Sequence, residues 1–259
     1  MPRYRITIEY DGTPFLGWQA QPTGPSVQGC ITAAIRRFSG ENVSVRGAGR
    51  TDSGVHACGQ VAHFDLERSF QPLTIREAIN FYLKPDPIVV VAADEADPDF
   101  DARFSATGRH YLYRILARKA RPVLDANRVW WVPRPLDHVA MAEAARHLIG
   151  RHDFTTFRAA GCQAKSPVKT LDRLDVRSEA EEIRIAVSAR SFLHHQVRSF
   201  AGSLKNVGEG RWSPAHMKTA LEARDRSTCG ALAPSCGLYL MQVDYGHTSS
   251  KPVGAEGMA

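Results

Sequence analysis

The sequence predicts an α+β protein made of two α/β halves with antiparallel or mixed sheets. Short segments in which apolar and polar residues alternate are interspersed with segments whose apolar residues recur at helical spacing, which indicates both strands and helices. The charge also reverses near residue 105. With 259 residues, 43% hydrophobic and 23% charged, the chain has the size and composition of one large or two smaller globular domains.

The first half opens with a strand over residues 4–10. One face of this strand carries every second residue, namely Tyr4, Ile6, Ile8 and Tyr10. A helix follows over residues 27–38, with Ser26 as its N-cap and Gly40 at its end. A short strand over residues 43–45 then leads into a glycine-rich loop.

The rest of the first half is a strand over residues 60–66, a helix over 74–83 and a buried strand over 87–93. An acidic segment, 94–101, comes next and has the composition of a linker or rim. Basic residues then cluster in one short region: Arg103, Arg109, His110, Arg114, Arg118, Lys119, Arg121 and Arg128. We therefore place a domain boundary near residue 105, with a first domain over residues 1–105.

The second domain is predicted over residues 106–245. Its expected strands cover residues 109–116, 168–176, 182–189 and 237–243, and its expected helices cover 138–148, a segment ending near 207, and 214–223. After Tyr245 the apolar pattern stops, so residues 246–259 are predicted to be a disordered tail.

Net charge, cysteine content and the lengths of the apolar segments narrow the possible classes of function. The net charge of +6 and the pI of about 9.2 favour a polyanionic partner. Five cysteines without a C-x-x-C pattern argue against a disulfide framework or a zinc ribbon and favour reduced thiols in the cytoplasm. The N-terminus has no apolar signal region, and the apolar run over residues 88–93 is far shorter than a membrane span, so no membrane association is expected.

The glycine-rich loop over residues 47–57 carries the most informative chemistry. Its three glycines allow tight turns and close approach of the backbone to a ligand. Arg50 and Asp52 are two positions apart, so in an extended segment they face the same side. The ionised carboxylate of Asp52 is able to act as a nucleophile, a general base or a metal ligand. The alternative is a surface ion pair worth about 0–1 kcal/mol.

The string Gly-Arg-Thr-Asp-x-Gly-Val-His-Ala in this loop is similar to the signature of the TruA family of tRNA pseudouridine synthases. In that family the aspartate matching Asp52 is catalytic. The arginine matching Arg50 helps to hold the target nucleotide flipped out of the RNA. Many members have alanine where this chain has Ser53, which is a small departure.

Further ordered segments carry the same resemblance, which covers residues 3–245. Arg109 to Tyr113 resembles the family element Arg-x-Tyr-x-Tyr, in which the tyrosine matching Tyr111 packs against the target base. Spacing alone would equally fit a strand with core tyrosines. Residues 192–198 resemble Phe-x-His-x-x-Val-Arg, in which the arginine matching Arg198 pairs with the catalytic aspartate.

The resemblance implies isomerisation of uridine to pseudouridine at positions 38, 39 and 40 in the anticodon arm of tRNA. It also implies a homodimer and a cleft between the two halves. No cofactor is implied, because the uracil detaches at N1 and rejoins through C5 without consuming a second reactant.

Other functions were weighed from the residues. His194 and His195 are adjacent, and His56 and His63 flank Cys58, but neither pair has the spacing of a metal-binding motif, so no metal is predicted. His194 is instead expected to form a hydrogen bond near Arg198. A two-carboxylate glycosidase would need an acidic companion that Asp52 lacks in its loop. An RNA-binding protein without catalysis and an aspartate-dependent nucleosidase remain as alternatives.

Overall fold

The computed structural model describes residues 1–246 of the chain. A ten-stranded mixed sheet is joined by five α-helices in this part of the chain. The strands are β1 (Arg3–Tyr10), β2 (Arg46–Gly47), β3 (His56–Asp65), β4 (Ile88–Ala96), β5 (Ala106–Ala117), β6 (Trp130–Val132), β7 (Gly150–Asp153), β8 (Val168–Glu179), β9 (Glu182–Ala189) and β10 (Leu238–Tyr245). The helices are α1 (Val27–Ser39), α2 (Pro72–Leu83), α3 (His138–Arg146), α4 (Gln196–Gly208) and α5 (Pro214–Ala223).

Local sequence explains why these elements form. Every second residue of β1 is fully or almost fully buried, as the alternation predicts. The Ser26 hydroxyl accepts a hydrogen bond from the Gly29 N–H and caps α1. Gly40 ends this helix in the left-handed conformation, with φ of 80°. The predicted helix over residues 214–223 is confirmed as α5.

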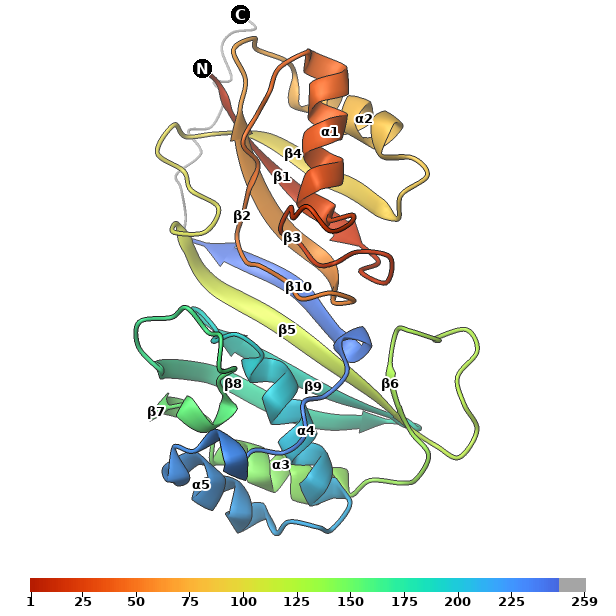
Figure 1. Cartoon of the computed structure of the whole chain (residues 1–259), viewed down its shortest axis with the longest axis vertical. Helices are drawn as coiled ribbons and strands as arrows, with labels where there is room; N and C mark the ends of the chain where they lie inside the picture. Colours follow the sequence, from red (N-terminus) through yellow and green to blue (C-terminus); the bar gives the residue numbers. More distant parts are fainter. Residues whose placement is uncertain (247–259) are drawn as a thin grey trace, which may run out of the picture.

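Strand β10, the last in the chain, lies in the middle of the sheet. The strand order is β4-β1-β3-β10-β5-β9-β8-β7, so β10 separates β3 of the first half from β5 of the second. It pairs parallel with β3 through Tyr239 opposite His56 and Leu240 opposite Ala57, and antiparallel with β5. The predicted α+β class with mixed pairing is confirmed, and the two halves share one continuous sheet (Figure 1).

Two hydrophobic cores lie at the two ends of this sheet. Helices α1 and α2 cover the first core beside β1 and β4, and α3, α4 and α5 cover the second beside β8 and β9 (Figure 1). Strand β10 contributes side chains to both cores, because Leu238 packs in the second core while Leu240 and Val243 pack in the first. The proposed boundary near residue 105 stays a prediction.

Some predicted element boundaries are wrong. The short strand expected over residues 43–45 lies at Arg46–Gly47, where it pairs with β3. Strand β7 was not predicted, because its sequence Gly-Arg-His-Asp is polar. It forms at the edge of the sheet, where Arg151 is exposed and the other residues are half-buried. Apart from Gly246, the predicted disordered tail lies outside the described residues. No helix among residues 1–246 is long and apolar enough to cross a bilayer.

Candidate active site

The loop between β2 and β3, which carries Asp52, is fixed by hydrogen bonds from three neighbouring segments. The Gln60 side-chain amide donates to the carbonyl oxygen of Gly49 at 2.8 Å, and the Trp18 N–H donates to that of Thr51 at 3.1 Å. The hydroxyls of Tyr10 and Thr51 are 2.8 Å apart. These bonds hold the backbone that leads into Asp52 in place before any ligand binds.

Arg109 ties the same loop to β5. Its guanidinium is only 8% exposed and donates at 2.7 Å to the carbonyl of Ala48 and at 2.8 Å to that of Arg103. Burial lowers the pKa of this guanidinium, and its neighbours are carbonyl oxygens instead of a carboxylate. Arg109 therefore brings an unpaired positive charge to the floor of the site.

Asp52 faces the N-terminal end of α4, where Arg198 lies. Nη1 of Arg198 donates to Oδ2 of Asp52 at 2.7 Å, across 146 positions of sequence. The Nε of Arg198 donates to the carbonyl of Ala233 at 2.8 Å, which fixes the guanidinium in its plane. The predicted neighbours Asp52 and Arg198 are thus in direct contact, and the bond is of the strong, charge-assisted kind.

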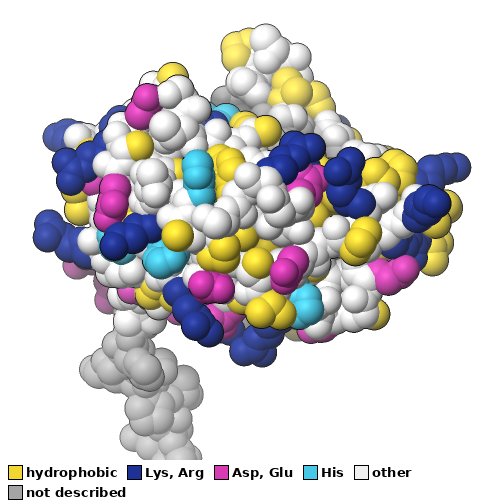
Figure 2. Space-filling model, turned by 90° about the horizontal axis from the view of Figure 1, so that it is seen from below, with side chains coloured by type: hydrophobic (Ala, Val, Ile, Leu, Met, Phe, Trp, Pro, Cys, Tyr) yellow, Lys and Arg dark blue, Asp and Glu magenta, His cyan; other side chains and the backbone are white. Residues whose placement is uncertain are grey.

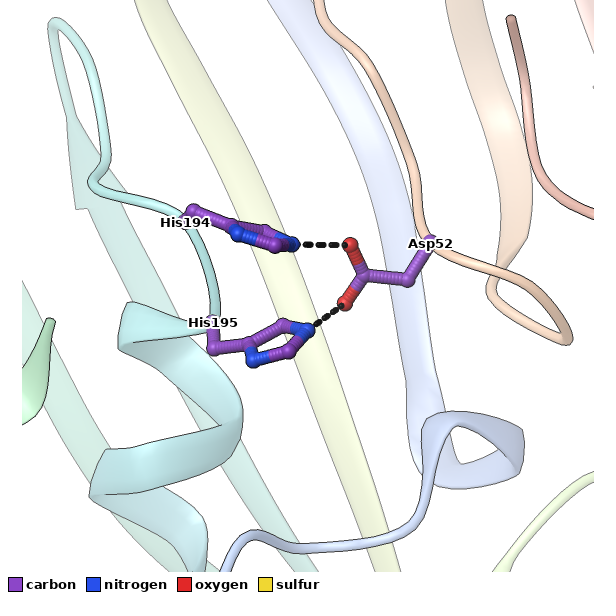
Figure 3. A group of neighbouring side chains, drawn as sticks. All are labelled: Asp52, His194 and His195. Carbon is purple, nitrogen blue, oxygen red and sulfur yellow. Dashed lines mark ion pairs between the residues drawn. The ribbon is translucent and has the colours of Figure 1, made fainter. Parts of the chain in front are cut away.

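His194 and His195 contact the same carboxylate (Figure 3). The Nε2 atoms of His194 and His195 lie 3.3 Å from Oδ1 and Oδ2 of Asp52, respectively. His195, directly before α4, adopts the left-handed conformation, with φ of 65°. Both rings thereby turn toward Asp52, with centroids 3.9 Å apart. His194 lies beside the carboxylate that Arg198 binds.

Burial lowers the pKa of His195, although the charge of Asp52 acts in the opposite direction. The ligand atoms of Asp52, His194 and His195 lie within 4.8 Å of one another, and a carboxylate with two imidazoles is a common zinc donor set. The Arg198 guanidinium occupies one carboxylate oxygen, and a metal ion there would sit beside a fixed positive charge. The geometry therefore favours Asp52 as a carboxylate held by hydrogen bonds and an ion pair over Asp52 as a metal ligand.

Tyr111 projects from β5 on the same face as Arg109, as its spacing predicts. Its ring packs edge-on against Phe192, with centroids 5.1 Å apart. Burial raises the pKa of Tyr111 to about 12, so the phenol stays neutral. A Cβ at Gly49 would lie 3.8 Å from the Tyr111 hydroxyl, so the loop that carries Asp52 passes directly beside this ring.

Arg50 contacts another loop in the wall of the same cleft. Its guanidinium lies 3.4 Å from the side-chain oxygen of Gln163 and is exposed. Among residues 1–246 no ion pair joins Arg50 to Asp52, so the simple surface pair is not formed.

A cleft of about 940 Å³ lies between the two halves and contains all four predicted residues. Its wall includes Asp52 and Arg50 from the first half and Tyr111 and Arg198 from the second. The predicted cleft between the halves is therefore confirmed. Its volume is at the upper end for ligand sites and has room for more than one nucleobase.

The basic residues around positions 103–128 are partly neutralised within the protein. Arg114 pairs with Glu182 at 2.7 Å, Arg118 with Glu181 at 3.1 Å, and Arg128 with Asp11 at 3.3 Å. Figure 2 views the end of the molecule that carries α3 and α5, and there Lys and Arg side chains are scattered among acidic ones. Ion pairs thus reduce the number of free positive charges in the basic region over residues 103–128.

The family model and the relatives that match this chain all carry the name tRNA pseudouridine synthase. A family model described as tRNA pseudouridine synthase matches residues 6–105 and 144–246. The tRNA pseudouridine synthase A of Sinorhizobium fredii is 60% identical over 247 residues, covering 95% of this chain and 100% of that protein. The protein of the same name from Paramagnetospirillum magneticum is 58% identical over 251 residues, covering 97% and 98%.

Among solved structures, a chain in the crystal structure of a Cbf5-Nop10-Gar1 complex is similar, with a TM-score of 0.37 and 13% identity. The similarity covers 92% of this chain and 48% of that chain. A likeness this distant supports no further conclusion.

Proposed function

We propose that this chain, which belongs to the family of tRNA pseudouridine synthases, isomerises uridine to pseudouridine at positions 38, 39 and 40 in the anticodon arm of tRNA. The reaction breaks the bond between C1′ of the ribose and N1 of uracil and forms a bond between C1′ and C5. The proton at C5 is lost and N1 gains one. Nothing is oxidised or consumed, so the proposal includes no cofactor.

The contact between Asp52 and Arg198 carries this proposal. The guanidinium stabilises the negative charge of the carboxylate at 2.7 Å, inside a cleft large enough for a flipped nucleotide. A carboxylate held this way has a free lone pair for attack or proton abstraction. We assign to Asp52 the role of the nucleophile or base that starts cleavage of the glycosidic bond.

Arg50 and Tyr111 receive roles in holding the substrate. Flipping a nucleotide costs a few kcal/mol, which contacts in the cleft must offset. Tyr111, fixed by Phe192, is suited to pack against the target uracil. Arg50, exposed at the rim, is long enough and free enough to occupy the space that the flipped base leaves.

The remaining assignments follow from the family resemblance. We infer that the enzyme is a homodimer in the cytoplasm and that residues 1–105 and 106–245 act as its two domains. The two hydrophobic cores support this division, while β10 joins the domains through the shared sheet.

Replacement of Asp52 by asparagine tests the function. Asn has nearly the shape of Asp but is a poor nucleophile and base, so Asp52→Asn should abolish turnover and leave tRNA binding largely intact. Pseudouridine, free uracil and tRNA affinity are measured together for the wild type and the variant. Wild-type turnover should persist in excess EDTA, because the proposed chemistry involves no metal.

Every other outcome of these measurements would show which part of the proposed function is wrong. Substantial pseudouridine formation by Asp52→Asn would refute the catalytic role of Asp52. Free uracil released by the wild type would make the protein a nucleosidase. Intact tRNA binding without any product from the wild type would make it an RNA-binding protein. Loss of activity in EDTA with recovery in zinc would assign a metal to Asp52, His194 and His195.

A further inference from the structure

Phe104 is an exposed aromatic side chain at the edge of the active-site cleft. Three aromatic side chains among residues 1–246 are exposed, namely Phe81, Phe104 and Trp131, and of these only Phe104 lines the cleft. Its exposed fraction is 77%. Single exposed apolar residues are common on protein surfaces, so the surroundings of Phe104 decide whether it has a function.

The turn that carries Phe104 is rigid. The Asp101 side chain accepts hydrogen bonds from the backbone N–H groups of Arg103 at 2.8 Å and Phe104 at 2.9 Å. The Ser105 N–H donates to the Asp101 carbonyl at 2.9 Å, and the Tyr245 hydroxyl donates to that of Ala102 at 2.7 Å. The ring of Phe104 is thus presented to solvent from a fixed backbone, which lowers the entropy lost on binding.

The same turn is connected to the catalytic loop by a single buried side chain. The Arg109 guanidinium donates to the carbonyl of Arg103 and also to the carbonyl of Ala48, four positions before Asp52. The backbone segments that carry Phe104 and Asp52 are therefore tied to each other through Arg109. A group bound against Phe104 would be held in register with the reacting nucleotide.

The charge beside Phe104 suits a nucleic acid. The Arg103 guanidinium lies 5.6 Å from the centroid of the Phe104 ring and, within residues 1–246, has no carboxylate within 4.0 Å. An aromatic face next to an unpaired cation is the combination by which proteins bind single-stranded nucleotides, with the base on the ring and the phosphate near the cation. Aromatic and arginine side chains are also enriched in protein interfaces, so the position of Phe104 in the lining of the cleft decides for the nucleic acid.

From these contacts we infer that Phe104 stacks against a nucleobase next to the flipped uridine and that Arg103 contacts the adjoining phosphate. Phe104 is a substrate-positioning residue, and the inference rests on the proposed function. The flipped uridine leaves its neighbours without a stacking partner on one side. Phe104 replaces that partner at the edge of the cleft that also contains Asp52.

Steady-state kinetics with full-length tRNA test the inference. Phe104→Ala should raise KM about 5- to 150-fold, the range found when base–aromatic stacking is removed. Its kcat should stay within about threefold of the wild type, since the catalytic group is untouched. Phe104→Trp should restore KM. Phe81→Ala, which removes an equally exposed ring from α2 outside the cleft, is the matched control and should change neither constant.

A second measurement identifies the stacked base. An abasic residue placed on the 5′ or the 3′ side of the target uridine should raise the wild-type KM by a similar factor at one of the two positions. At that position Phe104→Ala should add nothing further, because the two changes remove the same contact. Additive effects at both positions would overturn the inference.

The remaining outcomes separate this inference from the proposed function. A wild type that forms no pseudouridine would refute the function itself. Normal wild-type activity with an unchanged KM for Phe104→Ala would refute only the stacking role. If sedimentation shows a dimer for the wild type and a monomer for Phe104→Ala, Phe104 belongs to an interface between copies and the inference is wrong.

Discussion

At the scale of single residues, the ion pair between Asp52 and Arg198 joins the two halves. Water still reaches the pair, since 24% of the Asp52 side chain and 14% of the Arg198 side chain are exposed. A nucleotide that fills the cleft would exclude this water and lower the local dielectric constant, which strengthens the attraction between the two groups. The ion pair is therefore stronger in the complex than in the free protein.

His56 is a second residue that joins the two halves. Its Nδ1 accepts the Gly12 N–H at 3.0 Å, and its Nε2 lies 3.0 Å from the carbonyl of Asn127 and donates to it. Only the neutral ring with its proton on Nε2 makes both bonds. Burial lowers the pKa of His56, although Asp11, 3.2 Å from Nδ1, acts in the opposite direction.

This arrangement predicts a loss of stability in mild acid. Above the unfolded-state pKa of about 6.5, neither state binds a proton at His56. Below it the unfolded chain is protonated first, so the free energy of unfolding falls as the pH drops from about 6.5 through the lowered folded pKa. Tm should therefore fall more between pH 7.5 and pH 5.5 for the wild type than for His56→Gln.

The comparison with His56→Gln isolates this ring. Burial also lowers the pKa of His63, which stays in both proteins and contributes equally to both. At pH 7.5 the variant should lose about 1–2 kcal/mol, because glutamine replaces the ring's two buried hydrogen bonds imperfectly. Identical pH dependence in the two proteins would show that His56 does not titrate on unfolding.

At the scale of elements, α4 holds the site through close contact with the segment that precedes β10. A Cβ on Gly202 would lie 1.7 Å from the carbonyl oxygen of Ala231, so only glycine allows this approach. The Ser203 hydroxyl accepts the Gly230 N–H at 3.0 Å, and Ala233 accepts the Nε of Arg198 at 2.8 Å. The packing of this segment on α4 thus sets the plane of the Arg198 guanidinium.

Gly202→Ala should therefore affect both stability and activity. Overpacking of this kind costs about 1–3 kcal/mol, and the displaced segment would carry the Ala233 carbonyl away from Arg198. Thermal unfolding and turnover at a temperature where the variant is still folded measure the two effects. Gly161→Ala is the control for stability, since a Cβ there meets nothing within 4 Å. An unchanged Tm for Gly202→Ala would contradict the close packing.

At the scale of the whole molecule, one continuous sheet runs through both halves and connects the two walls of the cleft. Because β10 is bonded to β3 on one side and β5 on the other, the cleft walls are connected through backbone hydrogen bonds. The net charge of +6 comes from Lys and Arg side chains distributed along the chain. Several of these cations are paired with carboxylates. Unpaired surface cations must then supply the contacts to tRNA phosphates.

We expect tRNA affinity to fall steeply with salt. Each phosphate contact releases counterions and contributes about 0.7–0.9 to the slope of log affinity against log salt. Arg121→Gln should reduce this slope by about one contact, since Arg121 is exposed in the predicted basic region. Arg173→Gln is the control, because Arg173 is paired with Asp175. An affinity that stays flat between 50 and about 200 mM salt would contradict electrostatic binding.

The sequence by itself determined the local structure and indicated the candidate site residues. Alternation and helical spacing predicted nearly every long element, because burial of one face depends only on neighbouring residues. The loop with Arg50 and Asp52, and the segments with Tyr111 and Arg198, were recognisable from their residue types and order.

Only the tertiary structure decided how these pieces meet. The position of β10 between β3 and β5 depends on pairing between strands that are distant in the chain, for which periodicity carries no information. The backbone at His195, beside which two histidines turn toward one carboxylate, is left-handed, a conformation that a non-glycine residue seldom adopts and that local preference therefore does not predict. Phe104 likewise became a candidate only when the fold placed an exposed ring at the cleft, since exposure is a property of the whole molecule.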